Sequence, residues 1–216
     1  MLWEEYSKGK QTYQQLSQRY GVSIRTIQRR LDKVEIKQTY HKPCSSVILM
    51  DTTYFGRDFG VMVFKSTEGH HLYWRYVKYE TIAGYVEGIN YLQTQGIKIK
   101  AIVCDGRKGL FKALEEYPIQ MCQFHQIAII TRYITRNPKA QASIELKIII
   151  NLLTQTDKES FFGALDEWYN KWESYINERA INHETGRSRY VHKRLRSAYR
   201  SLERNKKYLF TWYPDF

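Results

Sequence analysis

Long apolar runs, cysteine pairs and acidic residues are all scarce in this sequence of 216 residues. No run reaches the roughly 18 apolar residues of a membrane-spanning helix, and the chain does not start with an apolar segment behind basic residues. The cysteines form no Cys-x-x-Cys pair, and three are too few for an even disulfide framework. We therefore expect a cytoplasmic protein with no membrane partner, whose Cys44, Cys104 and Cys122 are free thiols.

The shortage of acidic residues gives the chain a net charge of +12, from 34 Lys and Arg against 22 Asp and Glu. The excess lies at the two ends: residues 1–45 hold nine basic and four acidic residues, 46–130 nine and eight, and 131–216 sixteen and ten. A cationic surface attracts polyanions, because bound phosphates release counterions. The distribution favours a nucleoid-associated protein that holds DNA with its flanks. The alternative is a generally basic cytoplasmic protein.

Residues 11–34 predict two short helices around a tight turn. Leu16 and Tyr20 recur at helical spacing with Tyr13, and Gly21 tolerates a left-handed turn. Ser23 is a typical N-cap for the second helix. The apolar face of that helix is predicted to consist of Ile24, Ile27 and Leu31.

This helix-turn-helix pattern predicts a DNA-binding domain over residues 1–38, followed by a linker at 39–45 that contains Pro43. The second helix exposes polar side chains suited to base edges and phosphates in a major groove. A helical hairpin that only caps the larger domain is the alternative. The predicted DNA contacts are Arg25, Thr26, Gln28, Arg29 and Arg30.

Residues 46–135 alternate between strand and helix patterns and form the predicted core domain. Three strands, a helix, a strand, a helix, a strand and a helix follow one another, with short loops that make the first three strands an antiparallel meander. This order predicts an α/β fold with a ribonuclease H-like mixed sheet flanked by helices. The expected segments are strands at 46–50, 60–66, 71–79 and 97–105, a fifth strand that runs into a helix at 119–125, and helices at 81–96 and 110–117.

Two aspartates in this domain are the candidate catalytic residues. A right-handed crossover sets the strand at 97–105 parallel to and beside the first strand, so that Asp51, in or just after the first strand, approaches Asp105. Neighbouring carboxylates repel, and divalent cations relieve the repulsion. Two Mg²⁺ or Mn²⁺ ions there can activate an attacking oxygen and stabilise a leaving oxygen at phosphorus. The alternative for each aspartate is an ordinary turn residue at a strand end.

Asp105 also opens a set of spaced residues: the run Cys104-Asp105-Gly106-Arg107-Lys108-Gly109-Leu110, then Ala113, Pro118, Gln120, Cys122 and His125. Over residues 46–140 the chain resembles bacterial insertion-sequence transposases related to the eukaryotic Mutator-like group, which carry D-G-x-x-G-L-x-x-A, then Pro, then Q-x-C-x-x-H. The resemblance implies that Asp51 and Asp105 are the first two acids of an Asp-Asp-Glu triad. It further implies an enzyme, acting as a homo-oligomer on DNA, that cleaves transposon ends and joins a 3′-hydroxyl to target DNA with Mg²⁺ or Mn²⁺.

The role of the Cys-x-x-His pair stays open. The spacing of Cys122 and His125 occurs in zinc sites, but a structural zinc needs two further ligands, for which His70, His71 and Cys104 are the candidates. We do not expect zinc. The alternatives are a small buried thiol at Cys122 and a histidine that bonds near the carboxylates or contacts DNA.

Residues 136–216 predict an all-helical insertion region. One helix has Phe161, Leu165, Trp168 and Trp172 on an apolar stripe, and the segment from Arg187 to Lys207 holds nine basic residues and one acid. Beside a phosphoryl-transfer site, we expect the basic face of a last helix to contact DNA phosphates; a solvated or membrane-bound face is the alternative. The predicted contacts are Arg189, Lys193, Arg196 and Arg200, with Arg204 on the same face.

The third acid of the resembled family follows a helical insertion placed after the Cys-x-x-His pair, on a helix introduced by Asn-containing polar residues. The sequence YLFTWYPDF ends at Phe216, where such an insertion would finish. We therefore expect a C-terminally truncated transposase that cannot catalyse transposition alone. Glu184, in INHETG, is the internal candidate, although it precedes the basic helix and falls in a predicted loop.

Three functions agree with these features. The first is a DNA transposase, the second is a DNA-binding regulator that uses the helix-turn-helix on an inactive ribonuclease H-like fold, and the third is a structure-specific nuclease. A helix-turn-helix favours sequence-addressed DNA and so disfavours the nuclease. We expect the transposase.

Overall fold

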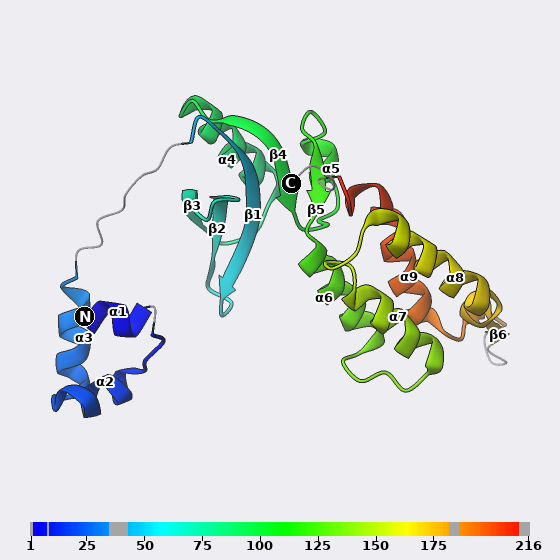
Figure 1. Cartoon of the computed structure of the whole chain (residues 1–216), viewed down its shortest axis with the longest axis horizontal. Helices are drawn as coiled ribbons and strands as arrows, with labels where there is room; N and C mark the ends of the chain where they lie inside the picture. The colour runs from blue at the N-terminus through cyan, green and yellow to red at the C-terminus, as the bar shows by residue number, and fades with distance from the viewer. Residues whose placement is uncertain (1, 8, 35–42, 182–185, 212–216) are drawn as a thin grey trace. The chain divides into compact units, whose positions relative to one another are not determined.

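The computed structural model describes residues 2–7, 9–34, 43–181 and 186–211 of the chain (Figure 1). The chain divides into two compact units, Met1–Tyr40 and His41–Phe216. Each unit has a hydrophobic core of its own. None of the helices in the described ranges combines the length and the apolar character that crossing a bilayer requires.

The described part of the N-terminal unit contains the helices α1 (Leu2–Ser7), α2 (Tyr13–Tyr20) and α3 (Ile24–Asp32). Helix α2 starts with a capping box, in which Thr12 and Gln15 satisfy each other's backbone N–H groups. Ser23 caps α3 by accepting a hydrogen bond from the backbone N–H of Thr26 at 3.2 Å. Between the two helices Gly21 takes a left-handed conformation with φ 61°. Both helices and the turn therefore lie where the sequence places them.

A small apolar core holds this unit together. Leu16, Ile27 and Leu31 are buried, and aromatic side chains of α1 pack against them. Helix α1 was not predicted from the sequence pattern. Ile24, expected on the apolar face, is 44% exposed, because it is the first residue of α3 and the core closes around the later turns.

The second unit is built on a five-stranded sheet with the order β3-β2-β1-β4-β5. Strands β1, β2 and β3 form the expected antiparallel meander, and β4 and β5 run parallel to β1. The strand beside β1 is therefore β4, as the sequence predicts. The strands are β1 (Ser45–Phe55), β2 (Phe59–Ser66), β3 (His71–Val77), β4 (Lys98–Cys104) and β5 (Ile119–Met121).

Helix α4 (Ile82–Thr94) packs tightly on one face of the sheet. Two glycines one turn apart make this approach possible: a Cβ on Gly88 would lie 2.0 Å from Cζ of Phe64, and a Cβ on Gly84 would lie 3.2 Å from Cε of Met62. Thr81 caps the helix through its hydroxyl, as expected. The short helix α5 (Leu110–Ala113) adds Leu110 to the same core.

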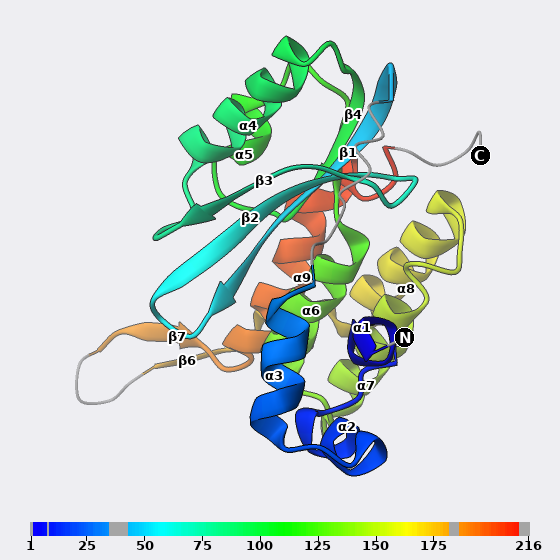
Figure 2. The same cartoon turned by 90° about the vertical axis from the view of Figure 1, so that its left-hand side faces the viewer.

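The rest of the second unit is a helical bundle with a core of its own (Figure 2). The buried face of its last helix includes Leu195, Ala198 and Leu202. The segment after His125 is not wholly helical as expected. A two-stranded hairpin interrupts it, because β6 and β7 pair antiparallel. The elements are α6 (Gln123–Ile134), α7 (Gln141–Asn151), α8 (Lys158–Asn177), β6 (Arg179–Ile181), β7 (Ser188–Tyr190), α9 (Lys193–Asn205) and the 3-10 helix η1 (Lys206–Tyr208).

Candidate functional site

The parallel pairing of β1 and β4 brings the two candidate aspartates together. Leu49 of β1 and Val103 of β4 are the last paired residues of the two strands. Asp51 lies two residues after Leu49, still within β1, and Asp105 lies two residues after Val103, directly beyond the end of β4. Neighbouring strands are about 4.8 Å apart, so the two residues are side by side at the carboxyl end of β4. Asp51 lies within β1, and its side chain is 56% exposed. Asp105 follows β4 directly and is half-buried.

Strand alternation decides which way Asp51 points. Its neighbour Thr52 turns toward α4, where its hydroxyl lies 2.9 Å from the hydroxyl of Tyr85. Asp51 therefore points to the opposite face of the sheet, because successive side chains alternate. One oxygen of each aspartate is oriented by a backbone N–H: Thr52 N donates to Asp51 at 2.9 Å, and Arg107 N donates to Asp105 at 3.2 Å.

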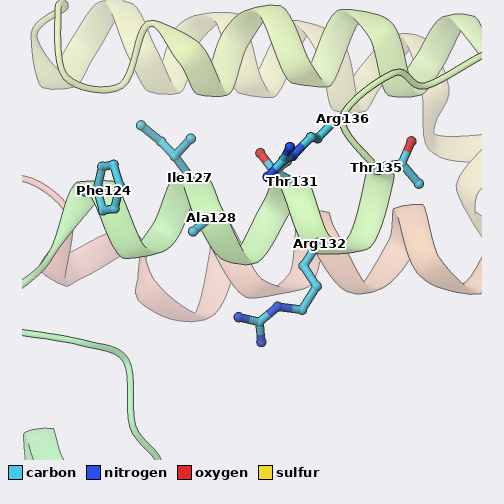
Figure 3. Close-up of a pocket in the computed structure, with 7 residues that line it drawn as sticks. All are labelled: Phe124, Ile127, Ala128, Thr131, Arg132, Thr135 and Arg136. Carbon is cyan, nitrogen blue, oxygen red and sulfur yellow. The ribbon is translucent and has the colours of Figure 1, made fainter. Parts of the chain in front are cut away.

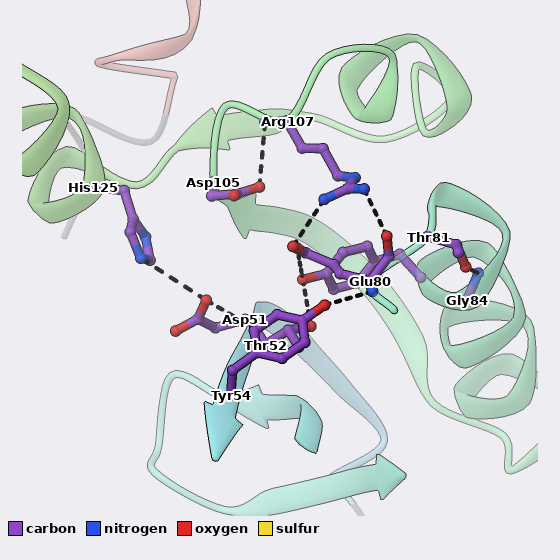
Figure 4. Close-up of polar contacts among 10 residues, drawn as sticks. Asp51, Thr52, Tyr54, Glu80, Thr81, Gly84, Asp105, Arg107 and His125 are labelled. Atoms are coloured by element: carbon purple, nitrogen blue, oxygen red, sulfur yellow. Dashed lines mark hydrogen bonds and ion pairs between the residues drawn. The ribbon is translucent and has the colours of Figure 1, made fainter. Parts of the chain in front are cut away.

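The Cys-x-x-His pair connects β5 to this site. The backbone N–H of Cys122 donates to the carbonyl of Cys104 at 2.7 Å, which ties the start of α6 to the end of β4. His125, in the first turn of α6, then places its Nε2 3.8 Å from Oδ1 of Asp51 (Figure 4). Its Nδ1 is buried and has no hydrogen-bond partner among the described residues. Of the two alternatives for this histidine, a bond near the carboxylates is the one that this geometry favours.

The candidate zinc ligands do not gather around the Cys-x-x-His pair. Burial, with a smaller contribution from the negative charge of Asp105, raises the pKa of Cys104 to about 12, so that this thiol stays protonated near neutral pH. His70 and His71 lie at the turn into β3, the edge strand two positions away from β1. Across the described residues no group of three or more His, Cys, Asp and Glu side chains is arranged to hold a metal ion. Any cation at Asp51 and Asp105 would therefore complete its coordination with water or substrate.

A third carboxylate, Glu80, lies beside the aspartates and was not found from the sequence. Its side chain is 16% exposed. Arg107 Nη1 donates to its Oε2 at 2.8 Å and Nη2 to its backbone carbonyl at 2.6 Å, while the Tyr85 hydroxyl donates to its Oε1 at 2.7 Å. The backbone N–H of Glu80 donates to the Tyr54 hydroxyl at 2.6 Å. Figure 4 shows Glu80 and Arg107 on one side of the aspartates and His125 on the other.

Arg107 links this carboxylate to the aspartates, because the same residue holds Asp105 through its backbone and Glu80 through its guanidinium. Burial, followed by the hydrogen bond to Glu80, raises the pKa of Tyr85 far above its usual value, so its hydroxyl remains a donor. The only signals in the sequence were the position of Glu80 directly before the helix cap Thr81 and the arginine in the run after Asp105. Neither reveals a partner distant in the chain.

The predicted DNA contacts on α3 are mostly available. Arg25, Gln28, Arg29 and Arg30 are exposed. Thr26 is not: it is half-buried, and its hydroxyl lies 2.9 Å from that of Ser23, because it takes part in the N-terminal cap of α3. A DNA contact by Thr26 therefore stays a prediction, for a side chain that already takes part in the cap.

The predicted contacts near α9 divide in a similar way. Lys193 and Arg200 are exposed on the helix, whereas Arg189 is exposed on strand β7 and not on the helix where the sequence placed it. Arg196 is half-buried, donates to the side chain of Asn177 and stacks over the ring of Tyr190 at 4.1 Å. This arginine anchors the β6–β7 hairpin to α9, and its contact with DNA stays a prediction. Glu184 lies outside the described residues.

Among solved structures, this protein aligns with one chain of a viral complex. That complex is the simian T-cell lymphotropic virus intasome with PP2A regulatory subunit B56 gamma, determined by cryo-EM. The sequences are 12% identical, the alignment covers 87% of this chain and 72% of that chain, and the TM-score is 0.29. A TM-score of this size does not establish a shared fold. No curated protein sequence matches the chain.

A family model described as "Transposase, Mutator family" matches residues 74–192, which is more than half of the chain. The matched segment contains Glu80, Asp105, Arg107, Cys122 and His125. Asp51 lies before it, so the pairing of β1 with β4 is what joins Asp51 to the matched residues. On the strength of this match, the chain belongs to the Mutator family of transposases.

Proposed function

We propose that the protein is a DNA transposase whose second unit processes DNA strands at Asp51 and Asp105, and whose N-terminal unit binds the DNA of the element ends. The observation that carries the proposal is the position of the two aspartates, each two residues beyond the last paired residues of the adjacent parallel strands β1 and β4. The strand order, with an antiparallel meander and two parallel strands, supports a ribonuclease H-like sheet. Membership of a transposase family supports DNA as the substrate.

The residues present fit a hard divalent cation. Mg²⁺ is commonly bound by one or two carboxylates and keeps several water ligands, so two aspartates without a third protein ligand are a sufficient set. Asp51 is exposed on a sheet face and Asp105 sits at the strand end, where a substrate phosphate can reach both. When bound there, Mg²⁺ or Mn²⁺ would lower the pKa of an attacking water and neutralise charge at the phosphate.

The surrounding side chains hold this pair in place. Arg107 fixes the loop that carries Asp105 by bonding to Glu80, which is itself fixed by Tyr85 and Tyr54. His125 lies 3.8 Å from Asp51 on the side of α6. A phosphate that meets both aspartates therefore encounters ligands whose positions are set before it arrives.

Divalent cation binding tests the proposal without requiring turnover. Titration of the full chain with Mn²⁺, followed by electron paramagnetic resonance, is expected to show a site that Asp51→Asn and Asp105→Asn each weaken by about tenfold or more, because each removes one anionic ligand. Asp58→Asn is the matched control: Asp58 is an exposed aspartate in the β1–β2 turn. Equal Mn²⁺ affinity in the wild type and both site variants would favour a DNA-binding regulator instead.

DNA binding by the N-terminal unit is tested separately. Mobility shifts with element-end duplex and random duplex across a series of salt concentrations separate specific binding from general phosphate attraction. We expect Arg29→Gln with Arg30→Gln to weaken binding and Ser7→Ala, in α1, to leave it unchanged. Equal affinity for element ends and random duplex, together with cutting of branched DNA, would favour the structure-specific nuclease.

A further inference from the structure

A cleft of about 500 Å³ opens between the loop at 106–109, helix α6 and helix α9. The cleft lies next to the aspartate site, because the loop that lines it directly follows Asp105. The packing under the loop is close: a Cβ on Gly106 would lie 3.0 Å from Sδ of Met121 and 3.4 Å from Nδ2 of Asn205. Helix α9, far away in the sequence, therefore borders the loop that carries Asp105.

The lining of this cleft is basic and contains no acidic residue. Arg107, at its inner end, is bound to Glu80. Lys108, Arg132 and Arg204 are exposed, and none of the carboxylates in the described ranges forms an ion pair with them. Three cations without a counter-charge around one concave surface create a positive potential that favours an anion with several charges.

Helix α6 directs one of these cations into the cleft. Arg132 lines the cleft. Figure 3, which draws a different pocket along α6, shows Arg132 leaving the helix on the side away from Arg136. The backbone carbonyl of Arg132 accepts a hydrogen bond from Arg194 of α9 at 2.7 Å, which keeps the ends of the two helices together. The spacing between Arg132 and the α9 side of the cleft is therefore fixed by the packing of the helices.

The floor of the cleft is a buried polar network that joins the same two helices. Gln126 of α6 is fully buried; its Nε2 donates to Oγ of Ser201 at 3.3 Å, and its Oε1 accepts from Nδ2 of Asn205 at 2.7 Å. Ser201 and Asn205 both line the cleft. Buried polar groups with satisfied bonds restrict the packing to one arrangement. The basic side chains above this floor are thus presented by a rigid base.

We propose that this cleft binds backbone phosphates of the DNA strand that leads away from the phosphate at the Asp51–Asp105 site. The inference rests on the proposed function, because it takes the aspartate pair as the place where the strand is processed. Lys108, Arg132 and Arg204 supply the charge, and contact with phosphates alone makes the binding independent of base sequence. Helix α9 then has a direct part in substrate binding, since it holds the strand beside the loop of Asp105.

The salt dependence of DNA binding by the full chain tests this proposal. Each phosphate contact that is lost reduces the slope of log K against log salt concentration by about one. With random-sequence duplex as the probe, Arg132→Gln with Arg204→Gln is expected to reduce the slope by about two, and Lys108→Gln by about one. The matched control is Arg136→Gln with Lys158→Gln, two exposed cations of the helical part that do not line the cleft.

Two further readouts separate this proposal from the proposed function. The Mn²⁺ affinity of the Arg132→Gln, Arg204→Gln protein should equal that of the wild type, since neither arginine touches the aspartates. A slope equal to that of the control pair, with Mn²⁺ binding intact, overturns the cleft proposal and leaves the metal site standing. A reduced slope in a chain whose Mn²⁺ affinity is insensitive to Asp51→Asn supports phosphate binding in the cleft while the proposed function fails.

Discussion

Three carboxylates lie close together in the second unit, but their surroundings differ (Figure 4). Glu80 belongs to a network of side-chain hydrogen bonds, and among the described residues Asp51 and Asp105 do not. Glu80 is mostly buried, and each of its oxygens accepts a hydrogen bond from a neighbouring side chain. The aspartates have a backbone N–H each, and Asp51 is largely exposed. A carboxylate whose oxygens are already bonded gains little from a cation, whereas two adjacent carboxylates without a Lys or Arg side chain bonded to them gain a great deal.

The difference assigns separate tasks to the two kinds of acid. Glu80 holds together β1, α4 and the loop after β4, because its partners Tyr54, Tyr85 and Arg107 come from those three elements. Asp51 and Asp105 do not stabilise the fold by comparable contacts, and we expect their proximity to cost stability until a cation is bound. Stability and cation affinity should therefore respond to different substitutions.

The largest effect on folding is expected at Glu80. Glu80→Ala leaves Arg107 and Tyr85 without their shared acceptor, and should lower the free energy of unfolding by about 2 kcal/mol, with the loss moderated by the partial exposure of Arg107. Chemical denaturation measures it. Mn²⁺ affinity at native conditions should fall by less than threefold, or about 0.6 kcal/mol. If Mn²⁺ affinity instead falls as far as in Asp105→Asn, Glu80 is itself a metal ligand, and the division between a structural Glu80 and metal-binding aspartates is wrong.

A smaller loss is expected at Tyr85. Tyr85→Phe removes only the hydroxyl that bridges Glu80 and Thr52, and should cost about 1 kcal/mol because Glu80 keeps its bond to Arg107. Thermal and chemical unfolding with matched buffers provide the measurement, and Tyr91→Phe, at an exposed position of the same helix, is the control. No difference between the two variants would show that the bridge does not stabilise the fold.

The smallest effect is expected at Asp51, and with the opposite sign. In the absence of divalent cations, Asp51→Asn removes a repulsion with Asp105 and should raise the free energy of unfolding by about 0.5 kcal/mol, an amount limited by solvent screening of this exposed side chain. Addition of Mn²⁺ should stabilise the wild type and not the variant. A clear destabilisation of the metal-free variant would mean that Asp51 has a structural role like that of Glu80.

The sequence was sufficient for features that depend on local pattern and chain order. Ser23 and Gly21 predict the turn between α2 and α3, and the order of strands and helices predicts that β4 lies beside β1, which is enough to bring Asp51 and Asp105 together. Both depend on rules that act over a few residues or on the handedness of one crossover.

Features that depend on distant partners could not be predicted in this way. The periodicity of α9 places Arg196 and Arg200 on the same exposed basic face. In the structure only Arg196 contacts Asn177 and Tyr190, which lie on other elements. Glu80 and Arg107 are paired by the approach of two loops, and nothing near either residue signals the other. Thr26 is a residue type that often contacts DNA, but its hydroxyl lies against that of Ser23, the N-cap of the same helix.

Metal-directed cutting of the polypeptide tests the central claim most directly. Fe²⁺ in place of Mg²⁺, with ascorbate and peroxide, generates radicals that cut the backbone next to the bound ion. We predict cuts both near Asp51 and near Asp105, and the loss of both sets in Asp51→Asn, because a single site between β1 and β4 is shared by two segments distant in sequence. Cuts confined to other segments, or cuts near Asp105 that persist unchanged in Asp51→Asn, would contradict a metal site formed by this pair.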